Sequence, residues 1–235
     1  MFLSALIASL CLASPVAADC VVLLHGLARS AASMGSLEKT FRKAGYQTVA
    51  IDYPSRRKTL PELARFVMAE IPQNCRAAPN VHFVTHSMGG ILLRYAAARL
   101  PDHLPRNMGR TVMLGPPNQG SEIVDHLGAS LWFQRSNGPA GGALDTGAAS
   151  WPKQLGAYPH ALGVIAGNQS IEPYWSVLIA GPDDGKVSVA STKLDGMDDH
   201  SGLPVTHTFM MYNPEVKRQA VYFLRHGRFE SADAS

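Results

Sequence analysis

The chain has 235 residues, of which 46% are hydrophobic and 17% are charged, and this length is sufficient for one α/β domain with a sizeable core. Its formal net charge is +3, and no basic run exceeds S-R-R-K at residues 55–58. The composition therefore argues against a nucleic acid as the principal partner, because phosphate binding requires a clustered basic face.

Residues 1–18 have the pattern of a secretory signal peptide. Residues 2–12 form an apolar run that is too short to span a bilayer, and V-A-A at residues 16–18 fits the small-residue cleavage rule. The segment before the apolar run has no Lys or Arg, and the alternative interpretation is a buried N-terminal strand or helix. We interpret residues 1–18 as an export signal, which predicts a periplasmic or secreted protein whose residues 19–235 form a single domain.

The first predicted strand, residues 20–24, runs directly into His25-Gly26-Leu27. A glycine just after a strand lets the backbone turn and point N–H groups into the crevice where such folds bind ligands. A helix over residues 36–44 and a second strand over residues 47–52 follow. The next predicted helix, residues 60–71, directs four apolar side chains inward: Leu63, Phe66, Val67 and Ile71.

The next strand leads into a sharp turn that carries a serine. Residues 81–85, V-H-F-V-T, are typical of a buried parallel strand, and the chain then turns through H-S-M-G-G into an apolar helix over residues 91–100. A serine at such a corner is held in a strained conformation that lifts its hydroxyl clear of the sheet. Gly89 and Gly90 allow the strand and helix backbones to approach each other. The alternative is that Ser87 only caps the helix.

The pentapeptide T-H-S-M-G at residues 85–89 resembles the nucleophile elbow, G-x-S-x-G, of the α/β-hydrolase superfamily of lipases and esterases. It departs from that pattern at Thr85, where the first glycine usually stands. The resemblance implies an α/β-hydrolase fold, a mostly parallel sheet flanked by helices, with Ser87 as the nucleophile. It also implies an oxyanion hole formed by the backbone N–H groups of Leu27, after the His-Gly pair, and Met88.

The second half of the chain has a fourth strand over residues 111–114, a Pro- and Gly-bearing loop and then an irregular segment, residues 121–161. Its aromatic residues fit a cap or lid over a hydrophobic acyl pocket, although burial under a long loop is an equal alternative: Trp132, Phe133 and Trp151. Apolar runs at residues 162–166 and 176–180 indicate further strands. The pattern ends with an amphipathic helix over residues 213–226.

The acid and the base follow the nucleophile in the resembled superfamily, in that order. The best candidate acid is Asp184, with Asp183 as the second choice, because their D-D-G loop resembles the acid loop of many esterases. We favour His207 as the base because it follows an apolar run and precedes the final helix. His200 follows two aspartates in what reads as a solvated turn, and His226 ends the last helix, where a positive charge is favourable. His86 is too close to Ser87 along the chain to serve as its base.

Cys11 lies in the predicted signal peptide, so the mature chain would keep two cysteines, Cys20 and Cys75. Cys20 begins the strand predicted at residues 20–24, and Cys75 precedes the strand predicted at residues 81–85. If these strands are neighbours in a parallel sheet, both cysteines lie at its N-terminal edge, within bridging range. We predict a structural Cys20–Cys75 disulfide, remote from the chemistry and consistent with export. The alternative is a pair of free buried thiols.

Together these features predict an exported serine hydrolase that cleaves carboxylic esters through Ser87, His207 and Asp184 by way of an acyl-enzyme. The same three residues would also support thioester cleavage or acyl transfer, and a non-catalytic binding module that keeps the fold is the alternative from another class. No metal or cofactor is expected, because the histidines show no ligand spacing such as H-E-x-x-H. The expected partner is an ester or lipid molecule, and the mild positive charge is compatible with transient contact with a membrane or lipid surface.

Overall fold

The computed structural model describes residues 17–231 of the chain. Almost all of the predicted signal peptide falls in residues 1–16, outside the described residues, and it stays a prediction. None of the helices within residues 17–231 is both long and apolar enough to cross a bilayer.

The centre of the fold is a six-stranded sheet in which every pairing is parallel and the strand order is β2-β1-β3-β4-β5-β6. The middle strands are continuously apolar because helices cover both faces of the sheet, and all residues of β1 and β3 are buried. The strands are β1 (Cys20–Leu24), β2 (Gln47–Ile51), β3 (Val81–His86), β4 (Met108–Leu114), β5 (Leu162–Gly167) and β6 (Asp199–Leu203).

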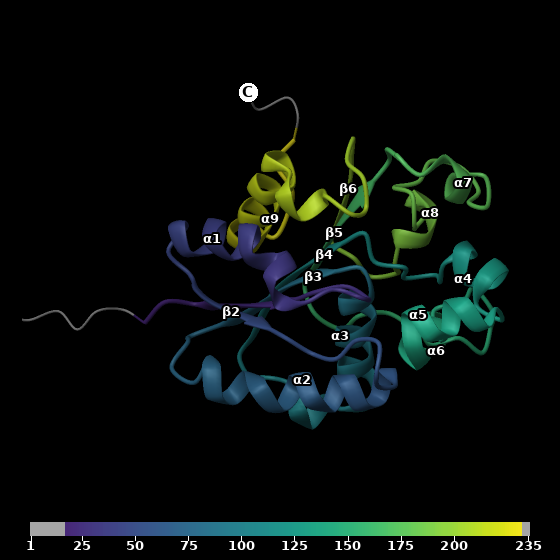
Figure 1. Ribbon diagram of the computed structural model, residues 1–235. Helices are drawn as coiled ribbons and strands as arrows, with labels where there is room; N and C mark the ends of the chain where they lie inside the picture. The colour runs from purple at the N-terminus through teal and green to yellow at the C-terminus, as the bar shows by residue number, and fades with distance from the viewer. Residues whose placement is uncertain (1–16, 232–235) are drawn as a thin grey trace, which may run out of the picture.

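Four helices form the two outer layers (Figure 1). Helices α1 (Gly35–Lys43) and α9 (Pro214–His226) cover one face of the sheet, and α2 (Leu60–Asn74) and α3 (Met88–Arg99) cover the other. Their apolar stripes pack on the sheet as two separate cores. The α1/α9 core contains Phe41, Val84 and Phe223, whereas the α2/α3 core contains Val67, Phe83 and Leu92.

The ends of these helices follow local chemistry. Helix α2 begins with a capping box in which the backbone N–H of Thr59 donates to the Glu62 carboxylate at 2.8 Å. Helix α9 is capped by the Asn213 side chain and stops at Gly227, whose φ of 74° is a left-handed conformation that glycine adopts readily.

The cap segment contains the helices α4 (Glu122–Leu127), α5 (Leu131–Gly142) and α6 (Trp151–Gln154), beside the ends of the strands. Helix α5 is kinked at Gly138, whose φ is 66°. The three aromatic residues of the cap segment differ in their exposure, so neither a uniformly exposed lid nor uniform burial under the loop describes them. Phe133 is buried, Trp151 is half-buried with its ring 5.0 Å from that of Tyr95, and Trp132 is 66% exposed.

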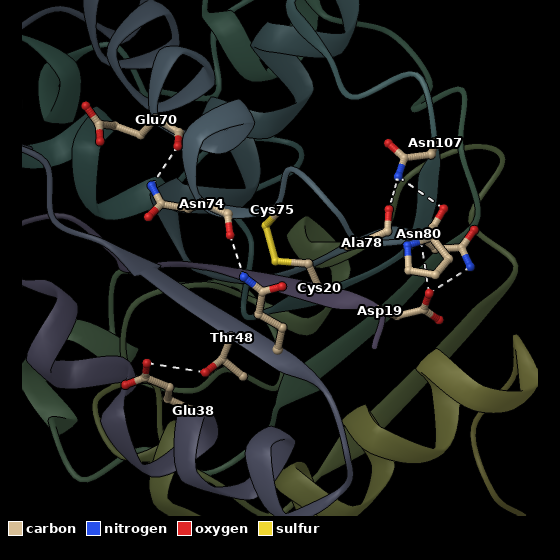
Figure 2. Close-up of a disulfide and its surroundings, with 12 residues drawn as sticks. Asp19, Cys20, Glu38, Thr48, Glu70, Asn74, Cys75, Ala78, Asn80 and Asn107 are labelled. Carbon is tan, nitrogen blue, oxygen red and sulfur yellow. Dashed lines mark hydrogen bonds between the residues drawn. A yellow bond between two sulfur atoms is a disulfide. The ribbon is translucent and has the colours of Figure 1, made fainter. Parts of the chain in front are cut away.

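Cys20 and Cys75 are joined by a disulfide at the N-terminal edge of the sheet (Figure 2). Strand β1 pairs with β3, Cys20 lies opposite Val81, and Cys75 is the C-cap residue that follows α2, before β3. The register therefore brings the two Cα atoms to 5.7 Å, a normal separation for a disulfide. This edge is opposite the carboxyl ends of the strands, where the candidate site lies.

Three predictions about individual segments were wrong. The apolar run at residues 176–180 is not a strand: it begins at the last residue of the short helix α7 (Pro173–Ser176), and its Val177 is 83% exposed. The polar residues around His200 are not a solvated turn but form β6, which pairs with β5 alone at the edge of the sheet. Phe66 on α2 points outward and is 39% exposed.

Candidate active site

Ser87 occupies the corner between β3 and α3 with φ 54° and ψ −125°, one of two non-glycine residues with positive φ within residues 17–231. This conformation costs of order 1–3 kcal/mol and persists only where the surroundings hold it. One contact that stabilises this conformation is a hydrogen bond from the Ser87 N–H to the carbonyl of Leu114 at 2.8 Å. Ser87 is half-buried, so its hydroxyl remains accessible at the end of the sheet.

The packing around the corner explains the departure at Thr85. The Thr85 side chain is fully buried, and a Cβ at Gly90 would lie 3.2 Å from its hydroxyl oxygen. The absence of a side chain at Gly90, on α3, therefore leaves room for the Thr85 side chain, which stands where a glycine is usual. At Gly89, a Cβ would lie 2.8 Å from the carbonyl oxygens of both Leu24 and His25, so α3 approaches the end of β1 through glycine alone.

Asp184 and His207 form a buried pair. The Asp184 Oδ2 atom lies 2.7 Å from Nδ1 of His207, and its Oδ1 accepts the N–H groups of Lys186 and Val187 at 3.0 and 2.8 Å. The carbonyl of Asp184 also accepts the backbone N–H of His207 at 2.8 Å. Asp183 faces away from this pair and accepts from the Ser176 hydroxyl at 2.8 Å. The carboxylate against the candidate base is therefore that of Asp184.

His86, the last residue of β3, supports His207, which lies in the segment after β6. Its Nε2 lies 3.0 Å from the carbonyl oxygen of His207, and the two ring centroids are 4.7 Å apart. Burial lowers the pKa of His86 well below its usual value, and the neighbouring His207 lowers it further. A neutral His86 that donates from Nε2 holds the backbone of His207 without placing a second positive charge beside it.

Ser87 and His207 line one pocket of about 260 Å³. Since Nδ1 of His207 is engaged by Asp184, Nε2 is the ring nitrogen available to the pocket. No hydrogen bond joins the Ser87 hydroxyl to His207 in the described part of the chain. The apolar wall comes mainly from the cap: Ile123, Val124, Leu127, Trp132, Phe133 and Leu144. Such a lining suits an apolar acyl group.

The loop after β1 is held by a cluster of buried side chains. His25 stacks on Tyr53 with ring centroids 3.9 Å apart, and the Tyr53 hydroxyl donates to the carbonyl of His25. The Tyr53 N–H donates to Nε2 of His25 at 3.3 Å, while Nδ1 of His25 is 2.8 Å from the Gly26 carbonyl. These contacts fit a neutral imidazole protonated at Nδ1, and burial lowers the pKa of His25.

The next residues of this loop run along the pocket that holds Ser87. Ala28 has φ 57°, and its N–H donates to the buried hydroxyl of Ser55 at 3.1 Å. The N–H groups of Leu27 and of Met88, the first residue of α3, have no acceptor within residues 17–231. Leu27 lines the pocket beside Ser87. Two unpaired amides flanking a serine are the arrangement that an oxyanion hole requires.

The other candidate histidines lie elsewhere. His200 is on β6, with Nε2 2.9 Å from the Thr192 hydroxyl, and burial lowers its pKa. His226 ends α9 with its ring 4.2 Å from that of Tyr222. Neither lines the pocket that holds Ser87. Within residues 17–231, no three His, Cys, Asp or Glu side chains form a group that could hold a metal ion.

Sequence reasoning missed two residues around the pair. Gly115, just after β4, has φ 53°, and a Cβ there would lie 3.0 Å from Asp184 Oδ2 and 3.1 Å from His207 Nδ1. Ser55 holds the loop of Leu27 from a different strand end. No local motif marks either residue, because each acts through a contact with a distant segment.

Comparison with known proteins places these features in a family context. A model of the alpha/beta hydrolase family matches residues 21–217. No curated protein sequence matches the chain. Among solved structures, the mature form of Bacillus licheniformis lipase BlEst2 has a TM-score of 0.69 at 20% identity, over 91% of this chain and 93% of that chain.

Two further solved structures share the fold. Phospholipase PlaB from Legionella pneumophila has a TM-score of 0.67 at 19% identity, over 92% of this chain and 61% of that chain. The metagenomic carboxyl esterase MGS0156 has a TM-score of 0.64 at 20% identity, over 82% and 65%. At these identities the likeness shows a common fold, and chemistry has to be argued from the site.

Proposed function

The chain belongs to the α/β-hydrolase family, and from this premise we propose that it is a serine hydrolase of carboxylic esters, with Ser87 as nucleophile, His207 as base and Asp184 as acid. The observation that carries the proposal is the 2.7 Å contact between His207 Nδ1 and Asp184 Oδ2 at the wall of the pocket that holds Ser87. An Asp–His pair beside a strained, accessible serine is the constellation that activates a hydroxyl.

In the proposed mechanism, Nε2 of His207 takes the proton of Ser87 as Oγ attacks the ester carbonyl. Asp184 fixes the ring tautomer and stabilises the imidazolium. The amides of Leu27 and Met88 donate to the oxyanion, each contributing a few kcal/mol in a site that excludes water. His207 then protonates the departing alcohol, and a water molecule activated by the same imidazole releases the acid. The Ser87–His207 hydrogen bond is expected to form on substrate binding, because such bonds are often long in free enzymes.

The proposed substrate is an ester with an apolar acyl chain, as in lipids. The pocket wall is apolar, and α5 presents Leu131 and Trp132, 70% and 66% exposed, beside it. Exposed apolar side chains next to a pocket favour transient contact with a lipid surface. A series of esters of increasing chain length, with and without an emulsified surface, separates a lipase from an esterase: a rate jump at the surface indicates a lipase.

We also propose export to the periplasm or the medium. The signal-like pattern of residues 1–18 supports it, and so does the disulfide between Cys20 and Cys75, since disulfides persist in oxidising compartments. The test is the N-terminal sequence of the protein recovered from periplasmic and culture fractions. An unprocessed chain confined to the cytoplasm would refute this proposal.

Labelling with a fluorophosphonate probe tests the nucleophile. We expect one label, at Ser87, and no label or hydrolysis of short p-nitrophenyl esters in Ser87→Ala at unchanged thermal stability. A wild-type protein that takes up no probe would refute the hydrolase proposal and favour a binding module. If thioesters are cleaved faster than esters, the function of the same three residues is thioester cleavage. If transfer of the acyl group to an added acceptor is faster than hydrolysis, their function is acyl transfer.

Paired variants test the other two roles. His207→Ala should abolish hydrolysis, whereas His200→Ala, on an edge strand away from the pocket, should not. Asp184→Asn should lower kcat by about 10⁴-fold, the loss seen when the acid of such a triad is replaced by its amide. Asp183→Asn is the matched control. An equal loss from both aspartate variants would contradict the assignment of Asp184.

A further inference from the structure

A second hollow adjoins the pocket of Ser87. Its volume is about 310 Å³, and it is lined by residues 52–57, after β2, together with Arg29 and Ser30, after β1. Arg29 lines both hollows, so the two adjoin at that residue. The loop of Leu27, which carries one of the proposed oxyanion amides, therefore separates an apolar pocket from a polar one.

The charge of the second hollow is unbalanced. Three arginines and one aspartate line it, an excess of two positive charges: Arg29, Arg56 and Arg57 against Asp52. One carboxylate oxygen of Asp52 is already engaged, since Oδ1 accepts the N–H of Ala31 at 2.9 Å. All three arginines are exposed, and within residues 17–231 none of their guanidinium groups has a hydrogen-bond acceptor or an ion-pair partner.

Neighbouring lysines behave differently. Lys58, the next residue along the chain, lies 3.9 Å from Glu62, and Lys186, in the Ser87 pocket, is paired with Glu172 and lies over the Trp175 ring. These two lysines are thus paired with carboxylates, whereas the three arginines that share the hollow are not. Unpaired arginines around one concavity raise the local positive potential and attract anions.

The walls of the hollow are well held. Ser55 is buried and accepts the N–H of Ala28, the buried Tyr53 stacks on His25, and the N–H of Arg57 donates to the Pro54 carbonyl at 2.9 Å. On the cap side, the backbone of Gly138 lies so close to the carbonyl of Arg56 that a Cβ would overlap it. The arginine-bearing backbone is therefore fixed relative to both the nucleophile and the cap.

We propose that this hollow binds an anionic group, a phosphate or a carboxylate, carried by the alcohol part of the ester. The inference rests on the proposed ester hydrolase function. The cap residues offer the acyl chain an apolar wall, and Arg29 lines both this pocket and the second hollow. Guanidinium groups match phosphate and carboxylate oxygens with paired N–H donors, which gives orientation as well as charge. The preferred substrate class is then an acyl ester of an anionic alcohol.

Two soluble esters with the same acyl chain test the proposal: 1-hexanoylglycerol 3-phosphate and 1-hexanoylglycerol, both kept below their micelle concentrations. The measured quantity is the ratio of their kcat/KM values. We expect a ratio of about tenfold or more in favour of the phosphate ester at low salt, falling as salt screens the charges. Arg29→Gln, and Arg56→Gln combined with Arg57→Gln, should each bring the ratio toward one. Lys58→Gln, on the same loop but outside the hollow, is the matched control and should keep the wild-type ratio.

Inorganic phosphate distinguishes a substrate group from a free ion. We expect it to inhibit hydrolysis of the neutral ester weakly and competitively in the wild type, and less in the double arginine variant. Inhibition by inorganic phosphate without any preference for the phosphate ester would overturn the inference, since the hollow would then hold a free anion only. The inference would also be overturned if the kcat/KM ratio of the two esters were near one in the wild type, or if the arginine variants kept the wild-type ratio. Either result would leave the proposed ester hydrolase function standing. If the wild type hydrolyses neither ester nor short p-nitrophenyl esters, the proposed function itself fails.

Discussion

Gly89 is the position at which one methyl group tests both the fold and the candidate site. A Cβ there would lie 2.8 Å from the backbone carbonyl oxygens of Leu24 and His25, and backbone atoms cannot rotate away as a side chain can. Overpacking of this kind costs about 1–3 kcal/mol, and the two backbone contacts place Gly89→Ala at the upper end. Alanine returns about 1 kcal/mol through its higher helix propensity. We therefore expect Gly89→Ala to lower the free energy of unfolding by about 2 kcal/mol.

Two other glycines provide graded controls. A Cβ at Gly90 would lie 3.1 Å from Sδ of Met113, which can move, and 3.2 Å from Cβ of Pro116 and Oγ1 of Thr85, all longer contacts than those at Gly89. Gly90→Ala should thus cost less than Gly89→Ala. A Cβ at Gly35, the first residue of α1, meets nothing within 4 Å, and its φ of −60° suits alanine. Gly35→Ala should be neutral or stabilising by up to about 1 kcal/mol.

The same contact predicts a functional effect. Moving the His25 carbonyl displaces the loop of Leu27 relative to Met88, and a shift of about 1 Å near a reacting centre can cost about 10²-fold in rate. We expect kcat on p-nitrophenyl butyrate to fall by about that factor in Gly89→Ala but not in Gly35→Ala. Urea unfolding followed by tryptophan fluorescence gives the stability term. A Gly89→Ala protein as stable and active as Gly35→Ala would refute the argument that α3 and β1 meet through glycine alone.

The remaining predictions concern other parts of the chain. Replacing Cys20 and Cys75 by alanine should cost about 4 kcal/mol by the chain-entropy relation for a separation of 55 residues, with kcat kept below the lowered melting temperature. Urea unfolding and ester hydrolysis check this, and unchanged stability would contradict it. Burial lowers the pKa of both His25 and His86, so below about pH 6.5 the unfolded chain takes up protons that the folded chain refuses. As the pH falls below that value, the free energy of unfolding should decrease by about 1.4 kcal/mol per pH unit for each histidine. His86→Gln should remove the contribution of His86, so unfolding curves between pH 7 and pH 5 should show a weaker pH dependence than in the wild type. Arg94 is buried, with its pKa lowered to about 10, and donates to four carbonyl oxygens. Arg94→Met should cost about 2–4 kcal/mol by leaving these acceptors unpaired, and a stable variant would contradict it.

The central strands were predictable because burial on both faces leaves a direct mark on their composition. The strand expected at residues 20–24 is β1 without a shift, and those expected at 81–85 and 162–166 differ from β3 and β5 by one residue at the end. β6 was missed because D-H-S-G-L carries no apolar signal. An edge strand is held by backbone pairing with one neighbour, so its side chains need not be hydrophobic.

The candidate site was predictable where its chemistry is local. Ser87 and Leu27 sit in short motifs directly after strands, and their positions follow from the chain turning there. The choice between Asp184 and Asp183 depended on which carboxylate faces His207, 23 residues further along the chain, and spacing alone left it open. The contact between His86 and the His207 carbonyl joins residues 121 apart and has no local signature.

The strand order explains why these segments meet. After β1 the chain passes to β2 on one side of the sheet, and after β3 it continues to β4 on the other, so the connections diverge between β1 and β3. This is where a parallel sheet opens a crevice at its carboxyl ends, and the loop of Leu27 and the corner of Ser87 flank it. The Asp184–His207 pair, from the far side of the sheet, must cross the end of β4 to reach that crevice. Gly115 permits the crossing, because its backbone lies against both side chains of the pair where any Cβ would intrude.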